Sequence, residues 1–200
     1  SYAHIGGQGL FEGDIVLGDA ASLEQIRKRA EDQLESFGLG IRGARFRWPN
    51  KIVPYAITDQ PNRDKILAAI DHWEAKTAIR FVVRKSEPDH LVFTTSATCR
   101  SFVGRQGGAQ ALWLSPGCSP GNIIHEIGHA VGLWHEQSRA DREKHVKIEW
   151  SNIQEAAKHN FTQHILDGEA LDDYDFASVM HYSSSAFAPV SYTHLRAHET

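Results

Sequence analysis

The stretch HEIGHAVGLWHEQ occupies residues 125–137 and decides how the rest of the chain is interpreted. In a helix, His125 and His129 project from one face, one turn apart, so both imidazoles can bind one metal ion. Gly132 can adopt the positive φ that ends a helix and reverses the chain, which would bring His135 back as a third ligand. Three protein ligands leave one position of a tetrahedral zinc ion open, whereas structural zinc sites are closed by four. The stretch therefore predicts a catalytic zinc site.

Glu126 follows the first histidine and would lie beside the ion without binding it. A carboxylate at this place can take a proton from a zinc-activated water, whose pKa falls to about 7, and pass it to a leaving amine. The alternative is an amphipathic helix that carries two histidines by chance. The glycine and the third histidine argue against that alternative. The sequence thus predicts peptide-bond hydrolysis without a covalent intermediate.

Three motifs give the chain a resemblance to a known family. The pattern H-E-x-x-H-x-x-G-x-x-H marks the metzincin metalloproteases, and HEQSRADRE at 135–143 is similar to the astacin branch of that group. SVMHY at 178–182 resembles the Met-turn of the same branch. The resemblance implies an α+β fold of two subdomains, with a mixed sheet and the zinc helix above the cleft. It also implies one zinc ion per chain and an endopeptidase that acts on proteins or peptides.

The resemblance assigns roles to three further residues. Met180, the only methionine in the chain, would form a hydrophobic floor under the imidazoles, although by composition alone it would be a core filler. Tyr182 would be an additional zinc ligand that can leave the metal and support the oxyanion; a buried structural tyrosine is the alternative. Glu136 would contact the mature N-terminus once a pro-segment has been removed.

Residues 1–38 resemble an astacin pro-segment. FEGD at 11–14 is similar to the F-x-G-D element, in which the aspartate occupies the zinc in place of water, so Asp14 is a predicted ligand of a latent form. A simple turn is the alternative. A capping box at 22–25 precedes apolar residues at helical spacing, which predicts an amphipathic helix over 23–37. An activating protease would then expose a mature N-terminus near Leu39, within residues 38–46.

Residues 39–190 are predicted to hold the catalytic domain. Runs of β-branched and aromatic residues predict strands at 51–57, 79–84, 91–95 and 109–114, and apolar spacing predicts helices at 63–77 and 122–131. The resemblance makes the last strand the edge above the cleft, to which a substrate adds antiparallel through main-chain hydrogen bonds. An ordinary sheet edge is the alternative. The predicted substrate-binding residues are Gln110, Ala111, Leu112, Trp113 and Leu114.

The last third of the chain is expected to be irregular. From about Asp141 onward the resemblance implies a lower subdomain with short elements around 148–159. Residues 191–200, SYTHLRAHET, are similar to no astacin and look like read-through of a cloning adapter. The C-terminal part of the catalytic domain would then be missing.

The two cysteines, Cys99 and Cys118, fit no zinc-ribbon spacing, which favours a disulfide over a further metal site. The resemblance implies that same pairing, at the rim of the cleft. A disulfide that closes a loop of this size would stabilise the folded state by about 3 kcal/mol. Ala78 stands where relatives have a cysteine of a second bridge. A disulfide predicts a secreted, extracellular protein.

Composition sets broader limits. A chain of 200 residues with 41% hydrophobic content can build one domain or two closely packed subdomains. A net charge of −4 argues against nucleic acid as the main partner. No apolar run approaches the length of a membrane span, and the chain begins at Ser1 without a signal peptide, so any secretion signal is expected to have been removed or omitted.

Two other functions compete with a peptidase. An inactive zinc-binding module for adhesion or as a decoy would not need Glu126, although a missing C-terminal part would favour it. A hydrolase of other substrates is disfavoured by the glycine, the third histidine and the Met-turn together. The acidic stretch 167–175 lacks a calcium-loop pattern and reads as a solvated turn. Structural roles are expected for His72, His90, His145, His159, His164 and His181.

Overall fold

The computed structural model describes residues 3–5, 8–11, 14–18, 39–58, 60–188 and 195–197. Contacts divide the chain into two units. We call the first the sheet unit, Asp14–Leu17 and Gly43–Leu133, and the second the loop unit, Ser1–Gly13, Gly18–Arg42 and Trp134–Thr200. The predicted helix over 23–37 lies outside the described residues, as do Glu12 and Gly13. Every helix in the described ranges is too short or too polar to span a lipid bilayer.

The sheet unit is built on four parallel strands in the order β6-β5-β7-β9. They are β5 (Ile52–Ile57), β6 (Arg80–Val83), β7 (His90–Thr95) and β9 (Ala109–Leu114), and each overlaps its predicted run. Among the described residues, Arg100 pairs antiparallel with Trp113 of β9 through a β-bridge. The predicted mixed sheet is therefore confirmed, and most of its pairing is parallel.

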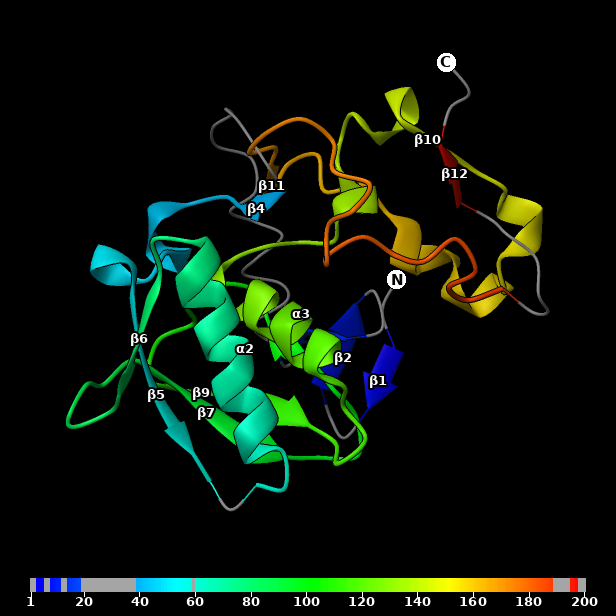
Figure 1. The fold of residues 1–200 in the computed structure, drawn as a ribbon. Coiled ribbons are helices and arrows are strands. Elements are labelled where there is room, and N and C mark those ends of the chain that lie inside the picture. Colours follow the sequence, from blue (N-terminus) through cyan, green and yellow to red (C-terminus); the bar gives the residue numbers. More distant parts are fainter. Residues whose placement is uncertain are drawn as a thin grey trace. The chain divides into compact units, whose positions relative to one another are not determined.

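Two helices cover one side of this sheet (Figure 1). They are α2 (Arg63–Lys76) and α3 (Pro120–Val131), and both overlap the predicted helices. The buried stripe of α2 includes Ile66, Ile70 and Trp73, which pack in the same core as Ile127 of α3. The indole nitrogen of Trp73 also donates to the carbonyl of Ile124 in α3, at 3.0 Å. The sheet and α2 thus hold α3 by both apolar packing and hydrogen bonds.

A second pair of strands lies at the rim of the sheet unit. β3 (Ile15–Gly18) pairs in parallel with β8 (Ser101–Phe102), with Ile15 opposite Ser101 and Val16 opposite Phe102. The amide of Ser101 also donates to the carbonyl of Asp14, at 3.0 Å. The segment that follows Asp14 is therefore an added strand of this unit.

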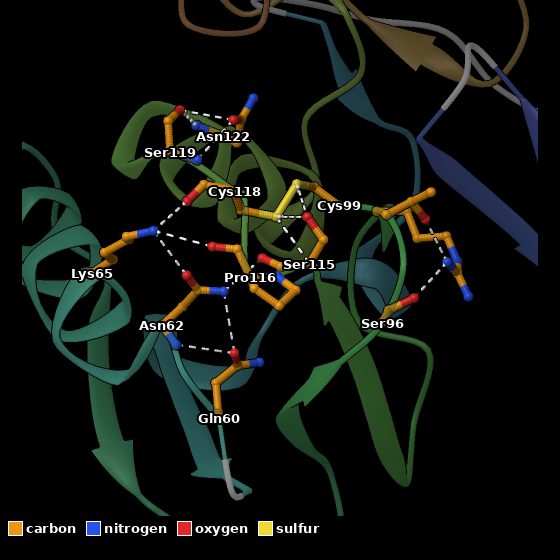
Figure 2. The surroundings of a disulfide bond; sticks show 12 residues. Gln60, Asn62, Lys65, Ser96, Cys99, Ser115, Pro116, Cys118, Ser119 and Asn122 are labelled. Carbon is orange, nitrogen blue, oxygen red and sulfur yellow. Dashed lines mark hydrogen bonds between the residues drawn. A yellow bond between two sulfur atoms is a disulfide. The ribbon is translucent and has the colours of Figure 1, made fainter.

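The predicted disulfide between Cys99 and Cys118 is present, and it closes the loop that leads into α3 (Figure 2). Lys65 of α2 reaches this loop: its Nζ donates to the carbonyl of Cys118 at 2.9 Å and to Asn62 Oδ1 at 3.0 Å. Asn62 Nδ2 in turn donates to the carbonyl of Ser115 at 2.7 Å. The loop before α3 is thus fixed by polar contacts from α2 as well as by the disulfide.

Arg105 forms hydrogen bonds with residues 45–47, near the start of the second segment of the sheet unit. Its backbone amide donates to the carbonyl of Phe46, its Nε to that of Arg47 and its Nη2 to that of Arg45. Its Nη1 pairs with Asp89. One arginine therefore holds three consecutive carbonyls around the short helix η1 (Ala44–Phe46), just before η2 (Pro49–Lys51) and β5.

The loop unit consists of short elements, as predicted for the region after residue 141. β1 (Ala3–Ile5) pairs with β2 (Gln8–Phe11), β4 (Gly40–Ile41) with β11 (Gly168–Glu169), and β10 (Val146–Ile148) with β12 (Leu195–Ala197), all antiparallel. Between them run the 3-10 helices η3 (Glu136–Ser138), η4 (Arg142–Lys144), η5 (Trp150–Asn152) and η6 (Glu155–Phe161).

Two buried arginines organise this irregular chain. Arg139 forms a bidentate ion pair with Asp141. It also donates to Glu136 Oε1 at 3.1 Å and to the carbonyl of Asp172 at 2.7 Å. Arg142 donates to the carbonyl of Gln137 at 3.1 Å and to that of Phe161. Because each guanidinium offers five donors in a fixed plane, these contacts join segments far apart in sequence.

Candidate metal centre

The local sequence explains why α3 begins and ends where it does. Ser119 is the N-cap: its Oγ accepts from the amide of Asn122 at 3.1 Å, and Asn122 Oδ1 accepts from the amide of Ser119 at 2.9 Å. Pro120 occupies the first turn, where no amide donor is needed. Gly132 ends the helix in the left-handed region at φ 114, as the sequence predicts.

His125 and His129 lie one turn apart on α3, with ring centroids 4.7 Å apart. His129 is fully buried, and its Nδ1 lies 2.7 Å from the carbonyl of Leu133. A carbonyl only accepts hydrogen bonds, so Nδ1 carries a hydrogen, and in the neutral ring Nε2 then keeps its lone pair. The helix end therefore fixes the tautomer that a metal ligand requires.

The carboxylate of Asp14 faces both imidazoles. Asp14 Oδ2 lies 3.4 Å from His125 Nε2, and Oδ1 lies 3.6 Å from His129 Nε2. These atoms all lie within 4.8 Å of one another. Tetrahedral zinc with bonds of about 2.0–2.1 Å separates its ligand atoms by about 3.3–3.4 Å. The donor set and its spacing therefore fit a zinc ion, with Asp14 as one ligand.

Glu126 lies between these two histidines in sequence and is buried, with 2% of its surface exposed. Arg100, at the rim, is close enough for its charge to interact with that of Glu126. Partial burial lowers the pKa of Arg100, and the negative charge of Glu126 opposes that shift. A buried carboxylate next to a metal site has the placement expected of a general base.

The loop unit carries the other predicted site residues. His135 is fully buried, and its ring centroid lies 4.5 Å from that of Tyr182. The amide of Tyr182 donates to Gln137 Oε1 at 3.0 Å, and the carbonyl of the buried Met180 accepts from the amide of Glu136 at 2.9 Å. The Met-turn is thus hydrogen-bonded to the residues that follow His135.

Glu136 is also buried, and its carboxylate is bonded within the loop unit. Its Oε1 accepts from Arg139 Nη1 and from the amide of Asp175, both at 3.1 Å. Leu39, the predicted start of the mature chain, lies in the same unit with 3% exposure, and its carbonyl accepts from the amide of Trp134 at 2.8 Å.

The edge of β9 is partly covered. The amide and carbonyl of Trp113 exchange hydrogen bonds with Arg100, at 3.0 and 2.9 Å. The guanidinium of Arg100 also lies 4.7 Å from the centroid of the Trp113 ring. A substrate strand therefore cannot use the Trp113 main chain in this structure. The strand that lies next to Asp14 is β8, since the amide of Ser101 donates to the carbonyl of Asp14.

The remaining candidates have structural contacts. His181 Nε2 lies 2.8 Å from the hydroxyl of Tyr174, and its Nδ1 lies 2.7 Å from the carbonyl of Tyr182. His164 Nδ1 pairs with Asp167 at 2.8 Å. Burial raises the pKa of Tyr174. In the described part of the chain, the acidic stretch 167–175 does not contribute to a group of potential metal ligands.

The sequence model of the astacin family of peptidases matches residues 41–199. That range covers most of the chain, including the candidate metal centre on α3. The chain belongs to the astacin family.

Curated relatives agree with this family. The chain is 36% identical over 185 residues to zinc metalloproteinase nas-4 of Caenorhabditis elegans, covering 88% of this chain and 57% of the relative. It is 40% identical over 154 residues to zinc metalloproteinase nas-6 of the same organism, covering 74% of this chain and 45% of the relative. The astacin chain therefore spans about half the length of these relatives.

A solved structure shares the fold. The chain is similar to high choriolytic enzyme 1, a hatching enzyme zinc-protease from the medaka Oryzias latipes, with a TM-score of 0.68 and 33% identity. The match covers 76% of this chain and 79% of that one. The predicted metzincin-like α+β fold is thereby confirmed.

Proposed function

We propose that this astacin chain is a zinc-dependent endopeptidase that acts on protein or peptide substrates. One observation carries the proposal: on α3 the Nε2 lone pair of His129 faces a carboxylate oxygen, and His125 and the buried Glu126 lie beside it. Acceptors that converge in this way need a cation between them, and membership of a peptidase family supports the same reading.

Three further residues are proposed to take part in the chemistry. His135 would be the third imidazole ligand, Tyr182 an additional ligand and Met180 the floor beneath them. The proposal is supported by the burial of His135, by its ring contact with Tyr182 and by the bond between the Met-turn and Glu136.

Each residue then has a chemical role. Bound zinc would supply positive charge that polarises the scissile carbonyl and acidifies water. Glu126 would accept the proton of the attacking water and deliver it to the leaving amine. His129 would keep its tautomer through Leu133, so that Nε2 stays unprotonated. The Tyr182 hydroxyl would donate to the oxyanion.

The test of the proposed activity is Glu126→Gln, which keeps the shape but cannot accept a proton. Cleavage of denatured casein by the activated protein should fall by at least about 100-fold, while metal content stays unchanged. The matched control is Glu155→Gln, at an exposed carboxylate, which should cleave normally. Retention of most activity by Glu126→Gln would exclude this residue as the base.

We further propose that residues 1–38 form a pro-segment that keeps the enzyme latent. The carboxylate of Asp14 lies where it would be a zinc ligand, and a carboxylate there would take the place of water. The pairing of β3 with β8 supports the same idea, since it covers the rim strand beside the metal. We therefore place the substrate strand along β8 rather than along Gln110–Leu114.

Latency is tested in the unprocessed chain. Asp14→Asn removes the charge but keeps the size, so it should weaken metal ligation and release activity without proteolysis. Glu12→Gln, two residues away, is the control and should release much less. Equal activities of the two variants, or an unmodified chain as active as its trimmed form, would leave Asp14 as a turn residue only.

The boundary of the mature enzyme is proposed just before Leu39. Ile41 pairs with Gly168, and Arg42 Nη2 donates to the carbonyl of Gly168 at 2.9 Å, so this short strand is bonded into the loop unit. Residues 39–190 would belong to the catalytic domain, and the family match continues to residue 199. N-terminal sequencing after activation should give a start within 38–46, and a start upstream of Ser22 would contradict this division.

An extracellular location is proposed on the basis of the disulfide between Cys99 and Cys118. Activation would then require an extracellular protease. Titration of free thiols in protein collected from culture medium tests this point, and two free thiols per chain would contradict it.

A further inference from the structure

Ile15, the residue after Asp14, is fully buried in the unprocessed chain. It lies opposite Ser101 in the pairing of β3 with β8. Side chains opposite each other in a pleated sheet share one face, so Ile15 and Ser101 point to the same side. Ser101 is also fully buried, and its hydroxyl donates to the carbonyl of Phe102 at 3.0 Å. An apolar side chain therefore lies beside β8 at a position that is closed to water in the unprocessed chain.

The direction of β3 relates this place to a substrate. β3 runs parallel to β8 and away from Asp14, which faces His125 and His129. The resemblance to astacins implies a substrate that runs antiparallel to its rim strand, and on β8 that direction leads toward these two histidines. Its residues before the cleaved bond would therefore lie where Ile15 and the residues after it now lie.

We propose that Ile15 occupies a substrate subsite, and that the activated enzyme prefers a branched aliphatic residue at one of the two positions preceding the cleaved bond. This inference rests on the proposed function, because it assumes that the rim beside Asp14 binds substrate. A side chain buried to this extent loses most of its contact with water, so a charged residue in its place should bind much more weakly.

The test begins with binding, which does not depend on turnover. Three synthetic peptides of residues 8–18 are compared for the activated Glu126→Gln protein: the natural sequence, Ile15→Val and Ile15→Asp. The natural and Ile15→Val peptides should bind within a few-fold of each other, and Ile15→Asp at least tenfold more weakly. Equal binding of all three would overturn the proposal.

Cleavage products complete the test. The unmodified activated protein is incubated with denatured casein, and the new termini are identified by mass spectrometry. Valine, isoleucine and leucine should be enriched at one of the two positions before the cut, and an absence of enrichment at both would overturn the proposal. No cleavage combined with weak Ile15→Asp binding would refute the peptidase function while supporting an aliphatic pocket on β8.

Discussion

In the sheet unit Phe93 and Ile127 are fully buried in an apolar core, whereas in the loop unit Arg139 and Arg142 are 3% exposed. The sheet unit is stabilised mainly by side chains removed from water and by the ladders of a parallel sheet. The loop unit has a smaller apolar cluster around Phe161, and much of its chain is joined by guanidinium groups that bind carbonyls. An irregular chain needs such donors because its own amides do not pair in regular ladders.

This difference explains what the sequence predicts well. Strands such as β7 and β9 consist of apolar and β-branched residues whose pattern is local, so the sequence predicts their bounds to within a residue or two. His125, Glu126 and His129 are predictable because their spacing on a helix is also local. The fit of Asp14 to this site depends on a four-residue resemblance, since nothing in its neighbours places it beside α3.

Other contacts cannot be predicted from the sequence because they join residues that are distant in sequence. The bonds of Arg105 to the carbonyls at 45–47 and the contact of Lys65 with the carbonyl of Cys118 leave no periodic signal. The covering of the Trp113 edge by Arg100 escapes prediction for the same reason. The burial of Ile15 could be suspected from its apolar neighbours in IVLG, but not its partner strand.

The largest effect expected from this comparison concerns Arg139. Arg139→Met removes the charge that Glu136 and Asp141 share, and leaves the carbonyl of Asp172 without this donor. Loss of one member of a buried ion pair costs about 3–5 kcal/mol in the free energy of unfolding. Equilibrium unfolding in urea measures this loss in the free energy of unfolding. The control Lys158→Met breaks only an exposed pair with Glu155 and should cost under about 1 kcal/mol. Similar losses would show that the buried arginine does not hold the loop unit.

A smaller effect is expected from pH. The hydrogen bond from Arg139 lowers the pKa of Asp141 below its usual value. A carboxyl group with a depressed pKa stabilises the fold above its unfolded pKa, and this contribution is lost as pH falls below about 4. The difference in unfolding free energy between the unmodified chain and Asp141→Asn should therefore shrink as pH falls from about 5 to 2. A difference that stays constant or grows would contradict this assignment.

The smallest effect concerns the sheet unit, at the turn before β5. Lys51 has a φ of 60 and is exposed, and Asn50 has a φ of 55. A left-handed conformation is unfavourable for lysine and is tolerated by asparagine. Lys51→Gly should raise the unfolding free energy by about 0.5 kcal/mol, since glycine's own entropy cost offsets part of the relief. Asn50→Gly should change it less. Thermal unfolding of both variants measures the difference, and destabilisation by Lys51→Gly would mean that the lysine side chain has a packing role.

Metal content, measured by inductively coupled plasma mass spectrometry, shows whether α3 presents a zinc site. The unmodified chain should carry one zinc per molecule. His129→Ala removes a buried Nε2 ligand and should leave far less than one, whereas His72→Ala, at an exposed position on α2, should retain the full amount. Undiminished zinc in a folded His129→Ala protein would rule out this zinc site, as would an unmodified chain that binds no zinc.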